Sequence, residues 1–243
     1  MNKRTFIKSV LLGIGGVFAL SITQSLQAAR TKKKWDGIFK LPELPYAFDA
    51  LEPFVDAETM ELHYTVHHGM FTEKFNSAVF EAGLTGNTAQ ELLKESSKYP
   101  ATIRTNGGGY LNHKLFWRIL TPHSDKKPSD RLLKSLNQNF GSVDAFKSDF
   151  KSAAQSVFGS GWAWLIVNKS GKLRITTTFN HDNPIMDVAP EQGIPLLCLD
   201  LCEHACSSKN KNRQEDYIDS FWNVVNWDVV SNRYEYSSKR FEV

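Results

Sequence analysis

The first half of the chain has the spacing of polar and apolar residues that is typical of helices. Asp56 can cap a helix over residues 57–80, because its carboxylate accepts hydrogen bonds from the unpaired N–H groups of a first turn. Two further helical stretches cover residues 88–98 and 110–120. Between them we expect the run of glycines at residues 107–109 to interrupt the helix. The pattern predicts an all-helical first half.

The second half combines helices with β-rich runs. Apolar and β-branched side chains fill residues 162–167 and 173–178, and the five residues between them, with Gly171 at the turn, indicate a β-hairpin. A third apolar run would complete a three-stranded sheet. The remaining expected elements are this third run, at residues 194–201, and helices at residues 130–138, 143–158 and 217–234. A polar connection with two prolines, residues 121–129, is the expected domain boundary.

The N-terminal residues have the pattern of a targeting segment rather than of a folded element. Basic residues precede an apolar stretch at residues 10–20, which is too short to span a bilayer and right for an export signal. We expect this signal to cover residues 1–29 and a basic leader to cover residues 30–40. The pair Lys3-Arg4 resembles the twin-arginine export motif, and a general secretory signal or an uncleaved anchor are the alternatives. All three place the body of the protein outside the cytoplasm, in the periplasm or another extracytoplasmic space.

Charge follows the same division. The chain has 29 Lys+Arg and 26 Asp+Glu, but residues 1–34 hold seven basic residues and no acidic one, so the body is slightly negative. A nucleic-acid-binding protein would need a basic face in the body. The composition is 41% hydrophobic and 12% aromatic with 3 Cys, which excludes a disordered chain and a disulfide-rich scaffold. We expect no nucleic-acid partner, and no membrane association once the signal is removed.

Histidine and aspartate positions suggest a metal site. His63 and His67 lie four residues apart and share one helix face, and Asp200 and His204 have the same spacing where a strand passes into a helix. His113 lies in an aromatic and apolar helix, where an unpaired imidazole would be costly to bury. The ordinary alternatives are surface or satisfied core histidines for the first pair and an Asp–His hydrogen bond for the second. Three imidazoles and one carboxylate suit iron or manganese, although these ligand types also admit zinc.

Seven sequence blocks carry a resemblance to one protein family. In chain order they are LPELPY (residues 41–46), ALEP (50–53), MELH with the pair HH (60–63 and 67–68), NHKLFW (112–117), FGSGWAWL (158–165), DLCEHA (200–205), and DY with FWNVVNW (216–217 and 221–227). Together they resemble the iron/manganese superoxide dismutase family. The resemblance implies an α+β fold, with an N-terminal antiparallel helical hairpin domain at residues 41–121. A C-terminal α/β domain with a three-stranded antiparallel sheet would follow at residues 130–243, and the metal would lie between the two.

The resemblance also implies a metal centre and a reaction. The metal ligands would be His63, His113, Asp200 and His204, with solvent in a fifth position and one Fe or Mn ion per subunit. The reaction would be ping-pong superoxide dismutation. In it the oxidised metal takes an electron from one superoxide and releases dioxygen, and the reduced metal gives the electron to a second superoxide, which leaves as hydrogen peroxide.

Further residues around the metal are assigned by the same resemblance. Trp162 would form an aromatic wall of the pocket, and His67 would lie in the access funnel. Arg213 would attract the superoxide anion. Glu203 would bond the partner's ligand histidine, the counterpart of His204, across a homodimer interface.

Three positions depart from the family pattern near the metal. The family's glutamine that hydrogen-bonds the metal-bound solvent comes from the position of Gly109 in iron-type members and from that of His181 in manganese-type members. A histidine at position 181 resembles a less common subgroup that is often iron-dependent or able to use either metal, so we expect iron. An imidazole there can also titrate near neutral pH. Phe71 stands where the family has its gateway tyrosine, which removes one hydroxyl from the proton relay.

The cysteines are the last departure. Cys198, Cys202 and Cys206 follow one another at a spacing of four, and the last two replace aromatic residues of the family. They are either small buried thiols or a redox-active set that forms a disulfide. The main alternative to an enzyme is therefore an exported metal-binding or redox-sensing protein of the same fold with little dismutase turnover.

Overall fold

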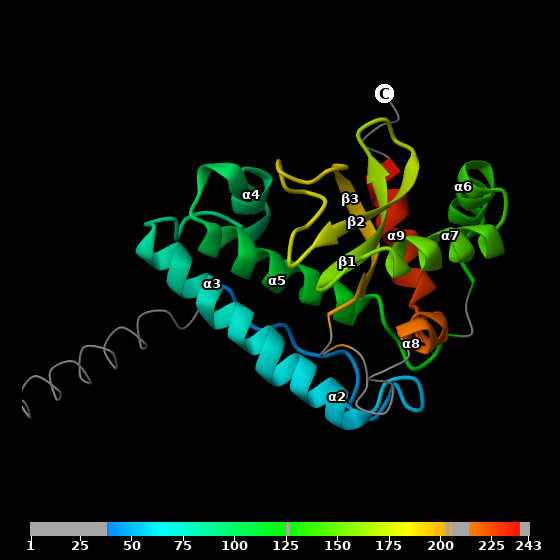
Figure 1. Ribbon diagram of the computed structural model, residues 1–243, viewed down its shortest axis with the longest axis horizontal. Coiled ribbons are helices and arrows are strands. Elements are labelled where there is room, and N and C mark those ends of the chain that lie inside the picture. Colours follow the sequence, from blue (N-terminus) through cyan, green and yellow to red (C-terminus); the bar gives the residue numbers. More distant parts are fainter. Residues whose placement is uncertain (1–37, 125–126, 203–204, 206–213, 239–243) are drawn as a thin grey trace, which may run out of the picture. The chain divides into compact units, whose positions relative to one another are not determined.

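The structure is a computed structural model that describes residues 38–124, 127–202, 205 and 214–238. Contacts divide the chain into Met1–Lys40 and Leu41–Val243, and the second unit holds every element below (Figure 1). None of the helices in the described ranges has the length and apolar character that a bilayer-spanning segment needs.

The first helical stretch forms as expected and contains an unusual turn. It consists of α2 (Ala57–Glu61), the π-helix η1 (Leu62–His68) and α3 (Gly69–Glu81). Asp56 caps it, since its carboxylate accepts from the N–H of Thr59 at 2.9 Å. The short α4 (Ala89–Lys94) and the 3-10 turn η2 (Ser96–Lys98) follow.

Helix α5 (Ala101–Arg118) corrects the expectation of a break at the glycines. The helix is continuous through Gly107, Gly108 and Gly109, all of which are buried. A Cβ added at Gly107 would lie 2.7 Å from the ring of Phe75, and one at Gly109 would lie 2.5 Å from the ring of Phe71. Gly107 and Gly109 therefore let α3 pack closely along α5, and this packing outweighs the low helix propensity of glycine. The two helices form the N-terminal hairpin (Figure 1).

The C-terminal part contains one antiparallel sheet in the order β2-β1-β3. Its strands are β1 (Gly161–Asn168), β2 (Leu173–Phe179) and β3 (Gly193–Asp200), and its helices are α6 (Asp130–Phe140), α7 (Val143–Gln155), α8 (Gln214–Phe221) and α9 (Trp227–Ser238). The hairpin turn between β1 and β2 has Gly171 at φ 74°, a conformation that glycine adopts readily. The expected α+β fold class is confirmed.

The closing helix is divided, which corrects the expectation of one stretch over residues 217–234. Between α8 and α9 the chain turns back to the end of α5, where Thr121 N–H donates to Val224 O at 2.8 Å and Asn226 N–H to Ile119 O at 2.7 Å. These backbone groups leave the helical pattern to make tertiary hydrogen bonds. They join the two halves of the fold beside the sheet.

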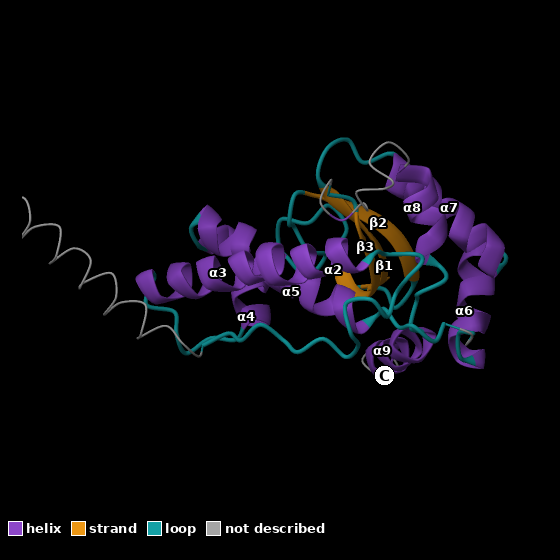
Figure 2. Cartoon of the chain, turned by 90° about the horizontal axis from the view of Figure 1, so that it is seen from below, coloured by secondary structure: helices purple, strands orange, loops and turns teal. Residues whose placement is uncertain are grey.

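The sheet lies between the hairpin and the later helices. Helix α5 contacts β3 on one side, while α7 contacts β1 and β2 on the other (Figure 2). Register places Trp162 of β1 opposite Asp200 of β3 and Thr178 of β2. Because β3 also contacts α5, Asp200 at the end of β3 lies on the side of the sheet that faces the hairpin.

Candidate metal centre

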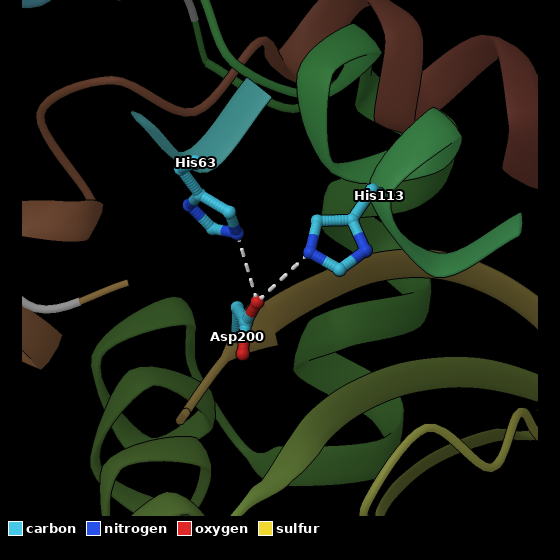
Figure 3. Close-up of side chains that lie close together, drawn as sticks. All are labelled: His63, His113 and Asp200. Atoms are coloured by element: carbon cyan, nitrogen blue, oxygen red, sulfur yellow. Dashed lines mark hydrogen bonds and ion pairs between the residues drawn. The ribbon is translucent and has the colours of Figure 1, made fainter. Parts of the chain in front are cut away.

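Three of the four expected metal ligands meet between the hairpin and the sheet. His63 comes from η1, His113 from α5 and Asp200 from the last position of β3 (Figure 3). One ligand atom from each lies within 4.8 Å of the other two, and all three residues are buried. The Nε2 atoms of His63 and His113 lie 3.1 Å and 3.5 Å from Oδ2 of Asp200.

The protonation of these groups fits a bound cation. His113 Nδ1 lies 2.6 Å from the carbonyl of Gly109, to which it donates, so Nε2 turns its lone pair toward Asp200. Burial lowers the pKa of His113 well below its usual value, with the nearby His63 as a further cause. The second carboxylate oxygen of Asp200 accepts from the N–H of Cys202 at 2.9 Å. Two imidazoles and a carboxylate that share one small space suit a divalent or trivalent transition metal.

Several expected site residues lie outside the described residues. These are the fourth ligand His204, together with Glu203, Arg213 and Cys206. Their assigned roles stay predictions.

Aromatic rings surround the three ligands. Phe71 stacks on His113 with ring centroids 5.6 Å apart, and Trp162 meets the same imidazole edge-on at 5.2 Å. His181 lies edge-on to Phe71 at 4.3 Å and tilted to His113 at 6.3 Å. His67 is half-buried and lies edge-on to His63 at 6.3 Å. The structure thus gathers all four described residues that were expected around the metal.

Trp162 adds a polar group to this apolar wall. Its side chain is fully buried, and its indole N–H has no acceptor among the described residues. An acceptor inside the pocket would remove the cost of burying this donor.

One buried histidine was missed by the sequence analysis. His68 accepts from the indole N–H of Trp117 at 2.9 Å, lies 3.1 Å from the carbonyl of Tyr110, and stacks on His113 at 5.3 Å. Burial lowers its pKa to about 3, so the ring is neutral. An α-helix would turn position 68 away from His63, but the π-helix η1 aligns residues five apart. No sequence signal marks such a turn; only the adjacent His67-His68 pair could have drawn attention to it.

The described cysteines are buried free thiols. Burial raises the pKa of Cys198 and of Cys202. Neither Cys198, in β3, nor Cys202, just after it, forms a disulfide with a described residue. Cys206 lies outside the described residues, so the redox-active set of three cysteines stays a prediction.

Comparison with known proteins gives two family matches and a close relative. Residues 38–121 match the family described as "Iron/manganese superoxide dismutases, alpha-hairpin domain", and residues 128–233 match "Iron/manganese superoxide dismutases, C-terminal domain". A curated relative from Acinetobacter baylyi (strain ATCC 33305 / BD413 / ADP1), named "Superoxide dismutase [Mn]", is 47% identical over 204 residues, which cover 83% of this chain and 90% of the relative. The chain therefore belongs to the iron/manganese superoxide dismutase family.

Proposed function

We propose that this protein is a superoxide dismutase that uses one Fe or Mn ion per subunit in a ping-pong cycle. The observation that carries the proposal is the buried group of His63, His113 and Asp200 within an aromatic shell. When bound, such a metal supplies one-electron exchange, which turns two superoxide ions and two protons into dioxygen and hydrogen peroxide.

The protein's own residues would hold the ion and limit access to it. His113 would bind through Nε2, because Gly109 holds its Nδ1–H. Phe71 and Trp162 exclude bulk water from the ligand side of the pocket, since both are buried and pack on His113. His204 is the proposed fourth ligand, and His67 and Arg213 are the proposed funnel residues.

For the metal, manganese is better supported than the iron expected from the sequence. The curated relative is named as a manganese enzyme. A side chain at position 109 would collide with Phe71, since a Cβ there lies 2.5 Å from the ring. Of the two positions that the family uses for the contact with metal-bound solvent, His181 is therefore the one that offers a side chain here.

Elemental analysis and activity of the metal-loaded forms test this proposal. We expect the mature protein to bind one ion per chain and to dismutate superoxide faster with Mn than with Fe. A variant with His113→Ala should lose the metal, whereas His123→Ala, a histidine outside the site, should keep it. Full metal content without turnover in either form would instead favour the metal-binding or redox-sensing alternative.

Export and dimerisation are further proposals. The basic and apolar pattern of residues 1–29 supports export to the periplasm. The proposed homodimer forms through Glu203 and His204. Phe158, which is 94% exposed, is a large apolar residue that such an interface could also cover. Sedimentation of the mature protein against a Phe158→Ser variant would test the dimer, which should dissociate more readily in the variant.

A further inference from the structure

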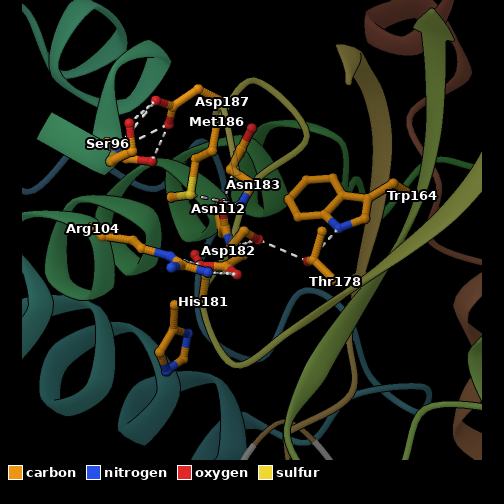
Figure 4. A network of polar contacts seen from close by, with 11 residues as sticks. Ser96, Arg104, Asn112, Trp164, Thr178, His181, Asp182, Asn183, Met186 and Asp187 are labelled. Atoms are coloured by element: carbon orange, nitrogen blue, oxygen red, sulfur yellow. Dashed lines mark hydrogen bonds and ion pairs between the residues drawn. The ribbon is translucent and has the colours of Figure 1, made fainter. Parts of the chain in front are cut away.

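The loop that carries His181 is held by an ion pair outside the ligand set. Loop residues 180–192 join β2 to β3. Arg104 of α5 donates to both carboxylate oxygens of Asp182, from Nε at 2.7 Å and from Nη2 at 2.5 Å (Figure 4). A two-pronged contact of this kind fixes the direction of the carboxylate as well as its distance.

The loop backbone is held at the same point by α5. The side-chain amide of Asn112 donates to His181 O at 3.2 Å and to Asp182 O at 3.3 Å. Gly108 lets the loop backbone come close to α5, since a Cβ at position 108 would lie 1.9 Å from His181 O. Asn112 and Gly108 thus set how near the loop comes to the helix that carries His113.

The sheet holds Asp182 from the other side. The indole N–H of Trp164 donates to Thr178 Oγ1 at 2.9 Å, and the Thr178 hydroxyl donates to Asp182 O at 2.7 Å. Asp182 is therefore fixed at its carboxylate by α5 and at its carbonyl by β2. The preceding residue, His181, turns its ring away from this network in Figure 4 and packs on Phe71.

We propose that the Arg104–Asp182 ion pair is a positioning element that sets where the His181 ring stands relative to the metal centre. The inference rests on the proposed dismutase function, because the ring is the group placed to act on a metal-bound ligand. Among the described residues, no contact joins Arg104 or Asp182 to His63, His113 or Asp200, so we treat the pair as positioning residues. The pair is partly exposed, with 39% and 19% of the two side chains accessible, so its loss should disturb the loop more than the overall stability.

The test compares substitutions of the pair with a matched control. Arg104→Gln and Asp182→Asn each remove one charge and the two-pronged contact, and Arg104→Lys keeps the charge alone. The control is Lys151→Gln, since Lys151 also contacts two carboxylate oxygens, those of Glu215 at 2.7 Å and Asp219 at 2.8 Å, but joins α7 to α8. All variants are metal-loaded, and their metal content, visible absorption spectrum and kinetics are measured.

We expect Arg104→Gln and Asp182→Asn to shift the absorption spectrum of the oxidised metal and to lower kcat/KM about tenfold at unchanged metal content. Arg104→Lys should give a smaller change, and Lys151→Gln should give none. The double variant Arg104→Gln/Asp182→Asn should lose no more than the worse single variant, because the two residues act as one pair. In a His181→Ala background, Arg104→Gln should add no further spectral shift.

Two results with the metal-loaded protein would overturn the inference. They are a wild-type spectrum and kinetics in both Arg104→Gln and Asp182→Asn, or an undiminished Arg104→Gln shift in the His181→Ala background. Amide hydrogen exchange in metal-free protein gives a reading that needs no turnover. Exchange of residues 180–187 should be at least about tenfold faster in Arg104→Gln than in Lys151→Gln, and equal rates would also count against it. If the wild-type protein binds metal but does not dismutate superoxide, the proposed function is wrong. The spectral and exchange measurements would still test the positioning role of the ion pair.

Discussion

At the scale of single residues, Phe71 shows how one missing hydroxyl changes the expected chemistry. Its ring is buried, stacks on His113 and lies edge-on to His181. It fills the place next to Gly109 that a larger side chain at 109 would need. The residue therefore shapes the pocket but can neither donate nor relay a proton.

Phe71→Tyr should restore a proton-carrying group beside His181. We expect the pH dependence of the dismutation rate to change and kcat to rise about threefold or more where proton delivery limits turnover. Pulse radiolysis across a range of pH would measure both. Phe80→Tyr, at the far end of the same α3 helix, is the control and should leave the profile unchanged. An identical pH profile in Phe71→Tyr and wild type would mean that the missing hydroxyl at position 71 does not limit proton delivery.

At the scale of elements, the glycines of α5 show where local propensity misleads. Gly107, Gly108 and Gly109 lower the helix propensity of a short window, so the sequence alone favours a break. Their small size is what the tertiary contacts require, because Phe75, the His181 carbonyl and Phe71 occupy the space of the three missing side chains. Helix propensities of single residues contain no information on these tertiary contacts, so they cannot predict the continuous helix.

Alanine substitutions separate propensity from packing in α5. Gly108→Ala should destabilise the protein by about 1–3 kcal/mol, even though alanine raises helix propensity by about 1 kcal/mol, because its Cβ meets the backbone oxygen of His181 at 1.9 Å. Gly109→Ala should cost less, since the Phe71 ring can move. Urea unfolding measures both, and Phe71→Leu should recover stability in Gly109→Ala but not in Gly108→Ala. A stabilised Gly108→Ala would show that the loop can retreat from α5.

The 3-10 turn η2 is tied to the loop by a carboxylate whose contribution depends on pH. Asp187 accepts from Ser96 Oγ at 2.8 Å and from both the N–H and the hydroxyl of Ser97. The Ser97 hydroxyl is the main cause that lowers the pKa of Asp187 below its ordinary 3.8. A lowered folded-state pKa means that the stabilisation is present above pH 3.8 and is lost as the pH falls below it.

Asp187→Asn should therefore reduce the free energy of unfolding at pH 7 by less than about 1 kcal/mol, because the carboxylate is exposed. The difference from wild type should shrink as the pH falls below 3.8. Urea unfolding of the metal-free protein at several pH values measures the difference. The control is Asp149→Asn, because Asp149 of α7 also carries an exposed carboxylate. If the difference in the free energy of unfolding between Asp187→Asn and wild type grew at acidic pH, the stabilising role given to the Asp187 carboxylate would be wrong.

At the scale of the whole molecule, the main parts of the fold and the group of His63, His113 and Asp200 were predictable from the sequence, for physical reasons that differ. The hairpin of β1 and β2 was predictable because Gly171 and the flanking β-branched runs are local signals. His63, His113 and Asp200 are 137 residues apart at most, and only the family resemblance could join them. His68 and the Arg104–Asp182 pair were not predictable, because a π-helical turn and a loop-to-helix contact leave no periodic pattern.

The same long-range ligand set should make stability depend on the metal. His63, His113 and Asp200 belong to η1, α5 and β3, so an ion bound by all three joins the hairpin to the sheet. An ion that binds the folded chain alone stabilises it by about 2.7 kcal/mol at a free concentration of 100 times Kd.

We therefore expect Mn²⁺ added to metal-free protein to raise Tm by several degrees in a thermal scan and a chelator to reverse the rise. Asp200→Asn keeps the volume of the side chain but removes its charge, so Mn²⁺ should raise its Tm far less. An equal rise in both proteins would mean that the ion binds elsewhere. If Mn²⁺ raised Tm in wild type only, the Asp200 carboxylate would be the group through which the bound ion joins the hairpin to the sheet.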